Sequence, residues 1–294
     1  ITRSVNATRY RLYFLMEYFE FSSILFLSSL FAGLLGALSG LGGGIIIVPL
    51  LMLGFNIDTQ YAVGASLISV IATSSGASVA FLKEGFTNIR LGIFLATATS
   101  IGAIIGAYAN THLPDHIIQI IFGCLLIYSV VTTYSRKKVI STKEIVLDPL
   151  TKKLHLDSHY PTANGPVYYQ PQRALYGWCM MLIAGIFSGL LGIGSGIFKG
   201  IGLEQGMSVP YKVSSTTSNY IMGMTAAASA GAFLHLGYIS PPIVMPLIPG
   251  ILIGSNIGAK LMMKVKPKKL KHLFMFLVLI IAVQMISEGF NLKF

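Results

Sequence analysis

Apolar runs of membrane-crossing length alternate with short polar segments along the whole chain. The runs cover about residues 22–55, 61–82, 91–110, 117–134, 174–207, 213–236, 243–263 and 272–287. A helix that spans the hydrocarbon core of a bilayer needs about 20 predominantly apolar residues. Six runs fit one crossing each, whereas the first and the fifth are longer and contain clustered glycines. The pattern predicts an all-α polytopic membrane protein.

The two long runs share a glycine motif, which indicates an internal duplication. LSGLGGG at Leu38–Gly44 matches LLGIGSG at Leu190–Gly196, at an offset of 152 residues. The same offset pairs, without a gap, Gly33 with Gly185, Ser66 with Ser218, Thr73 with Thr225, Gly102 with Gly254, and Gly106 with Gly258. We therefore predict two transmembrane repeats, residues 22–134 and 174–294. Residues 135–173 form a linker between them, and residues 1–21 form a tail or an interfacial helix.

The clustered glycines favour a break in the helix of each long run. Five of them lie between Gly36 and Gly44, and each costs a continuous helix about 1 kcal/mol relative to alanine. Breaks at matching positions in two halves of a membrane protein are typical of transporter substrate sites. Gly102 and Gly106, with their counterparts 152 residues later, instead favour close packing of continuous helices.

The basic residues bear on how each long run is threaded, because loops rich in Lys and Arg face the cytoplasm. If each long run crossed the membrane once, the linker and the basic segment 260–271 would lie on opposite sides. If each run enters and returns as a hairpin, these segments share one side with Lys83, Arg90 and Lys212. We therefore predict inverted repeats, with both termini outside and the linker in the cytoplasm. Three residues oppose this orientation, namely Arg3, Arg9 and Arg11.

Composition supports the membrane class and excludes others. The chain is 54% hydrophobic and 11% charged, whereas a soluble domain carries about 25% charged residues. The formal charge of +11 could indicate a nucleic-acid partner, but the basic residues cluster in loops between apolar runs, as expected beside anionic lipid. We therefore expect membrane lipid, and no nucleic acid, among the partners.

No sequence motif indicates an enzyme. HExxH, GxSxG and GxxxxGK[ST] are absent, so metalloprotease, serine-hydrolase and nucleotide-binding chemistry lack their signals. Cys124 and Cys179 lie singly in apolar runs, without CxxC spacing, and are interpreted as packing residues. We expect no catalytic residue, no metal and no cofactor.

The linker is polar and rich in proline, with the turn dipeptide Asn164-Gly165 before a VYY run. This pattern predicts a small hairpin and a short ordered element rather than a separate domain.

The two glycine motifs, AVGASL at Ala62–Leu67, and the tyrosine-containing polar stretch before the second motif resemble the TauE/SafE family of anion exporters, also called the toluene sulfonate uptake permeases. The resemblance runs from about residue 31 to residue 286. It implies secondary transport of sulfite, sulfonates or related organosulfur anions across a cytoplasmic membrane. The chain departs from the family pattern at Ser195, which replaces the middle glycine of the second motif, and at Lys199, where an apolar residue is expected.

Broken helices supply what an anion needs after it leaves water, namely unpaired N–H groups and the positive end of the helix dipole. If the hairpin tips meet at the membrane midplane, the backbone donors would come from Gly42, Gly43, Gly44, Gly194, Ser195 and Gly196. Side chains predicted to bind the anion are Ser66, Ser218, Asn219 and Lys199, and those predicted to line its path are Ser39, Thr73, Thr225 and Asn256. The alternative is that a hydroxyl bonds back to its own helix, and that Asn256 bridges two helices.

Lys199 has two interpretations of equal weight. A lysine inside an apolar run is costly and by default functional, and here it would place a positive charge near the second tip. Alternatively, it extends to the cytoplasmic surface and pairs with Glu204.

The leading hypothesis is a secondary carrier that binds a small anion at the midplane and works by alternating access. The alternatives are an anion channel on the same fold and a transporter of small carboxylates. The sequence leaves open whether a proton or another ion is coupled to transport, and whether the chain forms a homodimer.

Overall fold

A computed structural model of the chain describes residues 2–39, 42–83, 85–134, 148–162, 165–198, 200–264 and 268–290. The elements of the first half are α1 (Thr2–Ser39), α2 (Gly44–Pro49), the π-helix η1 (Leu50–Gly54), α3 (Thr59–Lys83), α4 (Ile89–His112) and α5 (Asp115–Tyr134). The linker holds α6 (Pro149–Lys153), β1 (Ser158–Thr162) and β2 (Gly165–Tyr169). The second half holds α7 (Ala174–Leu191), the 3-10 helix η2 (Ser195–Phe198), the π-helix η3 (Gly200–Gly206), α8 (Tyr211–His235), α9 (Pro241–Lys264) and α10 (Lys268–Gly289).

The predicted all-α membrane architecture is confirmed. The six shorter runs coincide within a few residues with α3, α4, α5, α8, α9 and α10. Among the described residues, six segments are long and apolar enough to cross a membrane, namely Phe19–Leu38, Thr59–Val79, Ile89–His112, Asp115–Thr132, Ala174–Leu191 and Pro241–Leu261. The helix α8 has 25 residues but is not among the six. Its residues 214–219 are all hydroxyl or amide side chains, which lower its hydropathy.

The first long run turns back on itself instead of crossing once. The rings of Phe21 and Phe55, which lie near its two ends, pack edge to face with their centroids 5.1 Å apart. At the opposite end of the run, the N–H of Gly42 donates to the carbonyl of Gly36 at 3.4 Å. The run is therefore a hairpin, with α1 as the outgoing leg and α2 and η1 as the shorter returning leg.

The second long run has the same shape. The helix α7 ends where Gly192 adopts a φ of +71°, and the chain returns through η2 and η3. The return reaches the start of α7, because the N–H of Gln172 donates to the carbonyl of Met207 at 3.0 Å. Near the start of α7, the side chain of Met207 also fills the space beside Gly177.

The two halves exchange their longest helices, with contacts that repeat at the offset of 152 residues. The helix α1 packs along α9 of the second half, and α7 packs along α4 of the first half. A Cβ on Gly33 would lie 2.6 Å from the carbonyl oxygen of Ile251, and Gly185 faces the carbonyl of Thr99 at the equivalent place. Gly106 lies as tightly against Ile186, which confirms close packing as the role of the spaced glycines.

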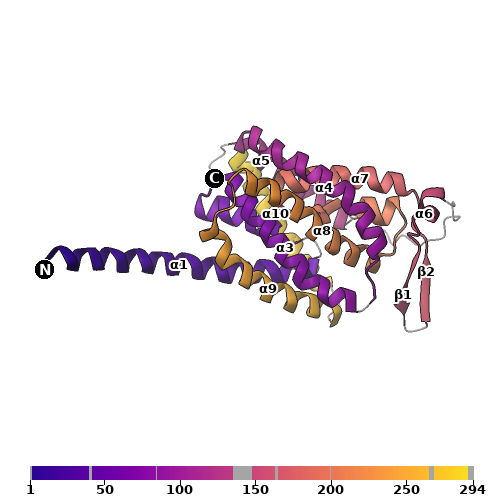
Figure 1. Cartoon of the computed structure of the whole chain (residues 1–294), viewed down its shortest axis with the longest axis horizontal. Helices are drawn as coiled ribbons and strands as arrows, with labels where there is room; N and C mark the ends of the chain where they lie inside the picture. The colour runs from indigo at the N-terminus through magenta and orange to yellow at the C-terminus, as the bar shows by residue number, and fades with distance from the viewer. Residues whose placement is uncertain are drawn as a thin grey trace.

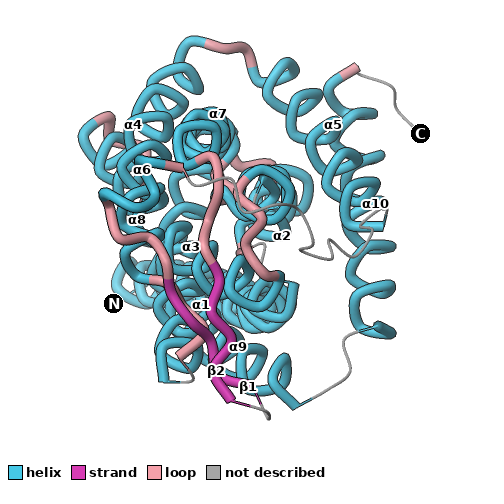
Figure 2. Tube along the Cα trace, turned by 90° about the vertical axis from the view of Figure 1, so that its right-hand side faces the viewer, coloured by secondary structure: helices cyan, strands magenta, loops and turns pink. Residues whose placement is uncertain are grey.

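The legs of the two hairpins are enclosed by helices from both halves. The helices α3 and α8 pack against each other, and α2 packs against α3 while η2 and η3 pack against α8. In the end-on view of Figure 2, α5 and α10 lie together at one edge of the molecule. Figure 1 shows α1 running toward the end that carries the β-hairpin, whereas α7 begins at that end and runs away from it.

The predicted hairpin in the linker is confirmed. Strands β1 and β2 pair antiparallel, in a register that runs from Ser158 opposite Tyr169 to Thr162 opposite Gly165. The buried side chain of Asn88 attaches this hairpin to the helices. Its Oδ1 caps α4 by accepting from the N–H of Leu91 at 3.0 Å, and its Nδ2 donates to the carbonyl of Leu156 at 2.9 Å and to the hydroxyl of Tyr169 at 3.0 Å. Burial raises the pKa of the Tyr169 hydroxyl above its usual value, so the group stays neutral at physiological pH.

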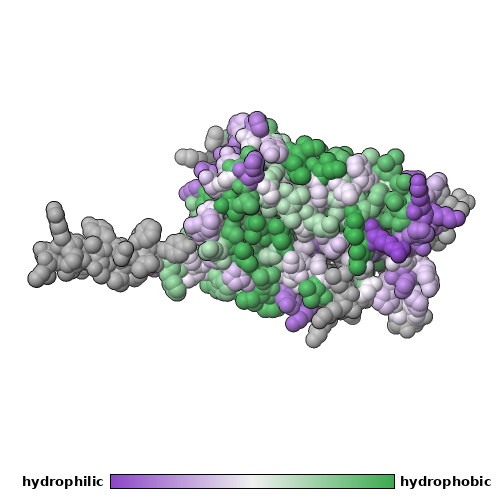
Figure 3. Space-filling view, in the orientation of Figure 1, coloured by the Kyte–Doolittle hydropathy of each residue, from purple (hydrophilic) through white to green (hydrophobic). Residues whose placement is uncertain are grey.

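The described charged side chains are mostly basic at the β-hairpin end of the molecule and acidic at the opposite end. Figure 3 shows hydrophobic surface along the middle of one face and hydrophilic surface gathered at the β-hairpin end. Exposed basic side chains at that end include Arg90, Lys152, Lys153, Arg173, Lys212 and Lys260. Acidic side chains near the opposite end are Glu20, Asp58, Asp115 and Glu288, and no Lys or Arg is among the side chains described there.

The exchanged helix contacts predict that Gly106→Ala destabilises the protein. The new methyl group would overlap the carbonyl of Ile186, and overpacking of this kind typically costs about 1 to 3 kcal/mol. The matched control is Gly231→Ala, because nothing lies within 4 Å of a Cβ there and alanine favours the helix. Thermal unfolding in detergent should show a lower midpoint for the first variant only. Equal midpoints would contradict tight packing between α4 and α7.

The bonds of Asn88 predict that Asn88→Ala loosens the linker. Loss of the helix cap costs about 1 kcal/mol, and each of the two other bonds adds a similar amount. Limited trypsin digestion should cleave at Lys152 and Lys153 faster than in the parent protein, and faster than in the Asn256→Ala control, whose altered side chain is exposed on α9. Unchanged cleavage would show that other contacts hold the linker.

Candidate functional site

The tips of the two helical hairpins meet between α3 and α8. A Cβ on Gly42 would lie 3.7 Å from both Val70 and Met222, and one on Gly194 would lie 3.3 Å and 3.2 Å from the same side chains. Val70 and Met222 are themselves repeat partners, and each lies near the middle of its helix. The expected meeting of the tips is therefore present, about halfway along α3 and α8.

Glycine is required at the tips because the backbones touch. Gly42 and Gly194 adopt φ values of +84° and +73°, a region that favours glycine. Gly44 lies so close to the carbonyl of Gly192 that a side chain would overlap it. The hydroxyl of Ser66 donates to the same carbonyl, which joins α3 of the first half to the tip of the second.

Two short helices begin at this meeting point. The helix α2 begins at Gly44, with Gly43 as its N-cap, and η2 begins at Ser195. The first N–H groups of a helix have no partner within it, so both starts direct backbone donors toward the tips. Gly196 is buried in η2, while the structure describes the backbone of Ser195 but not its side chain.

Ser218 and Asn219 are buried on α8 without hydrogen-bond partners, within one turn of Met222, which contacts both tips. Ser218 is 1% exposed and Asn219 is 0% exposed. The Oγ of Ser218 and both amide atoms of Asn219 lack a partner. The Ser66 hydroxyl, at the equivalent position of the first half, is bonded across the tips. Most buried polar side chains in proteins are paired, so this concentration needs an explanation.

The hydroxyls of the predicted path residues Thr73 and Thr225 are both hydrogen-bonded within the protein. The hydroxyl of Thr73 donates to the carbonyl of Ser69 at 2.8 Å, one turn earlier in α3, and lies 3.0 Å from the Cβ position of Gly43. The hydroxyl of Thr225 bonds that of Thr99 on α4 at 2.6 Å and the carbonyl of Ile221 at 2.8 Å.

The remaining predicted residues are not brought to the tips by any described contact. Asn256 is exposed on the outer surface of α9. Ser39 is the last residue of α1, and its side chain is not described. Lys199 lies outside the described residues. Their roles stay predictions.

The two repeats differ in polarity where they are otherwise alike. The segment Ser214–Asn219 reads SSTTSN, and its counterpart 152 residues earlier is AVGASL, Ala62–Leu67. All six side chains of the second segment are buried. Sequence reasoning singled out only the last two of them, Ser218 because it matches Ser66 and Asn219 because it lies beside Ser218, and it missed the four residues before them. A side-by-side comparison of the halves would have found the segment.

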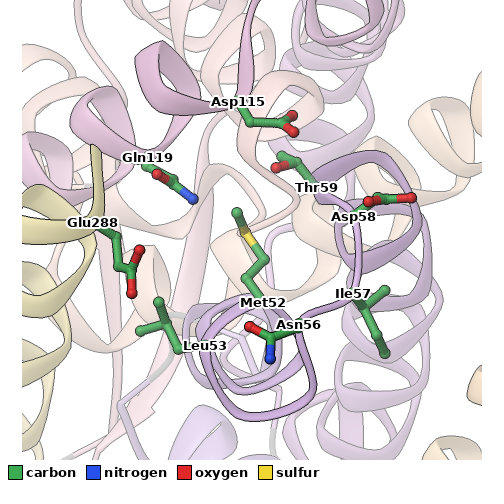
Figure 4. Close-up of a pocket in the computed structure, with 9 residues that line it drawn as sticks. All are labelled: Met52, Leu53, Asn56, Ile57, Asp58, Thr59, Asp115, Gln119 and Glu288. Carbon is green, nitrogen blue, oxygen red and sulfur yellow. The ribbon is translucent and has the colours of Figure 1, made fainter. Parts of the chain in front are cut away.

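The cavity at the opposite end of the molecule is acidic. It has a volume of about 190 Å³ and lies where η1, α3, α5 and α10 meet, lined by Met52, Leu53, Asn56, Ile57, Asp58, Thr59, Asp115, Gln119 and Glu288. Figure 4 shows the side chains of Gln119 and Glu288 directed toward Met52. Three acidic side chains repel an anion, so the tips, with their hydroxyls and N–H groups, suit an anion better than this cavity.

A protein-family model described as sulfite exporter TauE/SafE matches residues 25–285 of the chain. The probable membrane transporter protein YunE of Bacillus subtilis (strain 168) is 26% identical over 273 residues, which cover 90% of this chain and 97% of the relative. YdhB of the same strain, also named a probable membrane transporter protein, is 23% identical and covers 81% of this chain and 87% of its own. The probable membrane transporter protein MJ0441 of Methanocaldococcus jannaschii is 24% identical, over 87% and 91% of the two chains. No solved structure matches the chain.

The unpaired amide of Asn219 predicts that Asn219→Leu does not destabilise the protein. Leucine stands at the equivalent position 67, and the change removes two buried polar atoms that lack partners. An unsatisfied buried polar group costs about 1 to 3 kcal/mol, so the thermal midpoint without substrate should stay level or rise. Thr225→Val, which breaks two formed bonds, should lower it. A fall of several degrees in Asn219→Leu would contradict the assignment of an unpaired amide.

Proposed function

The chain belongs to the sulfite exporter TauE/SafE family of membrane transporters, and from this premise we propose that it carries small sulfur-containing anions across the cytoplasmic membrane by alternating access. The substrate class comprises sulfite, sulfonates and related organosulfur anions. The anion binds at the meeting point of the two hairpin tips.

The observation that carries this proposal is the set of buried, unpaired polar atoms on Ser218 and Asn219. A ligand with several acceptor oxygens can take up the donors of the hydroxyl and the amide together with N–H groups from the starts of α2 and η2. The free energy lost by leaving these groups unpaired is then recovered when the anion binds. A sulfonate or sulfite ion offers three oxygens that point in different directions, which fits donors arriving from α8 and from both tips.

The proposed alternation rests on the way the hairpins are held. Their returning legs are short: α2 packs against α3 and α10, and η2 and η3 pack against α7 and α8. Each leg contains a π-helical segment, η1 or η3, a geometry that is rare and frequent at functional sites. A small shift of one leg against the crossing helices would open the tips toward one side and leave them closed toward the other.

The inverted orientation of the repeats is part of the proposal. It is supported by the exchanged contacts of α1 and α7 and by the opposite directions of these helices in Figure 1. The basic side chains at the β-hairpin end support a cytoplasmic linker, because loops rich in Lys and Arg face the cytoplasm. Both termini would then lie outside.

A thermal-shift screen of the detergent-purified protein tests the substrate class. The panel is sulfite, sulfate, methanesulfonate, thiosulfate and small carboxylates, each applied to the parent, Asn219→Leu, Lys199→Ala and the control Gln284→Leu, which changes an exposed amide of α10. A ligand at 100 times its dissociation constant stabilises the folded state by about 2.7 kcal/mol. We expect a selective shift by sulfur oxyanions that is lost in Asn219→Leu and retained in the control. Loss in Lys199→Ala as well would add that lysine to the site.

Other outcomes of the screen would overturn parts of the proposal. If only carboxylates raise the thermal midpoint, the proposed substrate class is wrong. If sulfur oxyanions still raise the midpoint of Asn219→Leu, the anion does not bind at the tips. Counterflow of a bound anion in proteoliposomes separates a carrier from a channel, because a channel does not exchange anions one for one across the bilayer.

A further inference from the structure

A further buried hydroxyl lies at the turn of the second hairpin. Ser188 is 1% exposed, and its Oγ has no hydrogen-bond partner. It lies on α7 one turn before Gly192, whose N–H donates to the carbonyl of Ser188 at 2.9 Å. A buried polar group without a partner is costly, and most such groups in proteins are paired. The hydroxyl of Ser188 therefore needs an explanation of its own.

Serine within a helix commonly pairs its hydroxyl with a carbonyl three or four residues earlier. Ser69, Ser229 and Ser255 form this bond, at 3.0, 3.2 and 3.2 Å. The hydroxyls of Ser188 and Ser218 form no such bond. Both of these serines lie within one turn of residues that form or contact the second tip. Unpaired hydroxyls thus occur where the candidate anion site is.

The first half shows in which direction a side chain at position 188 points. The residue equivalent to Ser188 is Gly36, and a Cβ there would lie 2.5 Å from the backbone nitrogen of Gly43. A side chain at this position therefore points from the outgoing leg of the hairpin toward the start of the returning leg. The first hairpin has no room for such a side chain, whereas the second holds a serine.

The returning leg of the second hairpin lies between Ser188 and the polar segment of α8. The helix η2 packs against both α7 and α8, and its Phe198 ring stacks on that of Phe187, with centroids 5.5 Å apart. On α8, Met222 contacts the second tip and lies one turn after Ser218. Ser188 and Ser218 therefore lie on the two helices that flank the second tip.

The unpaired groups on these two helices can donate hydrogen bonds. Each hydroxyl has one O–H, and the amide of Asn219 has two N–H groups. Asn110, which is buried near the end of α7, differs in this respect. Its Nδ2 donates to the carbonyl of Leu190 at 2.7 Å, and only its acceptor Oδ1 lacks a partner. An acceptor does not bind an anion, so the side-chain donors at the tip are those of Ser188, Ser218 and Asn219.

We propose that Ser188 binds the third oxygen of a sulfonate head group and thereby makes the site prefer sulfonates to anions with two oxygens. The inference rests on the anion site proposed above. The three oxygens of a sulfonate diverge from the sulfur atom. Ser218 and Asn219 are neighbours on α8 and donate to two of these oxygens, while Ser188 donates to the third from α7. A sulfinate or a carboxylate has no third oxygen, so the hydroxyl of Ser188 adds little to its binding.

Two matched anions test this role on the full-length protein purified in detergent. Methanesulfonate and methanesulfinate carry the same methyl group and the same charge at neutral pH, but they have three oxygens and two oxygens. Isothermal titration calorimetry gives the dissociation constants for the parent, Ser188→Ala and Ser229→Ala. Ser229 is a suitable control because it is a buried serine of α8 whose hydroxyl is bonded within its own helix.

We expect Ser188→Ala to weaken methanesulfonate binding about tenfold, because one hydrogen bond to a charged group is lost. Its affinity for methanesulfinate should stay close to that of the parent, and Ser229→Ala should bind both anions as the parent does. Ser188→Gly introduces the residue present at position 36 and should show the same selective loss, since the first hairpin forms its turn without a side chain there. The thermal midpoint of ligand-free Ser188→Ala should not fall, because no hydrogen bond is removed.

An equal loss of affinity for both anions would overturn the proposal, because it would show that Ser188 supports the site as a whole and does not bind one oxygen. Unchanged binding of methanesulfonate by Ser188→Ala would place this residue outside the site and leave the proposed function standing. If the parent binds neither anion, the substrate class itself is wrong, and this inference fails with it.

Discussion

Backbone N–H and C=O groups cannot be left without partners in the hydrocarbon core of a bilayer, and the arrangement of this protein depends on that constraint. The chain interrupts a helix twice at membrane depth, at the tips near Gly42 and Gly194. Such interruptions are tolerated only where protein surrounds them. The crossing helices α3 and α8 provide that enclosure, and each tip also covers the other. Glycine is required at Gly44 because the backbone of the second tip leaves no room for a Cβ there.

The two repeats share the same arrangement of helices but differ in their polar side chains. The contacts of α1 with α9 and of α7 with α4 repeat at one offset, so the two halves build equivalent frames. Polar groups repeat only in part. Ser66 and Thr73 have buried hydroxyl counterparts in Ser218 and Thr225, whereas Ser214, Asn219 and Glu204 stand opposite the apolar residues Ala62, Leu67 and Met52. Two equivalent repeats can therefore carry a single polar site, because the side chains that form it occur in only one of them.

Much of the fold was predictable from the sequence, because hydrophobic runs and glycine clusters are local signals. Crossing helices, both hairpins and the linker hairpin follow from run lengths, from the glycines and from Asn164-Gly165 before VYY. The packing of α1 against α9 was not predictable, since it joins residues far apart in the sequence through contacts that only small residues permit. The site was predictable in part. Ser66 and Ser218 were found through their repetition, but repetition cannot tell that one hydroxyl is bonded and the other is not. Asn88 was missed because its role depends on a linker that reaches it only in the folded chain.

The exchange of long helices between the halves has a consequence for biosynthesis. The helix α1 is made early, but the surface that covers its small residues belongs to α9, which begins at Pro241. Roughly two hundred residues must therefore be inserted before α1 reaches its final neighbour. Until then, Gly33 and the residues around it face lipid or another protein of the membrane. The first half therefore cannot reach its final packing on its own during synthesis. Its helices must still be able to rearrange when α9 is inserted.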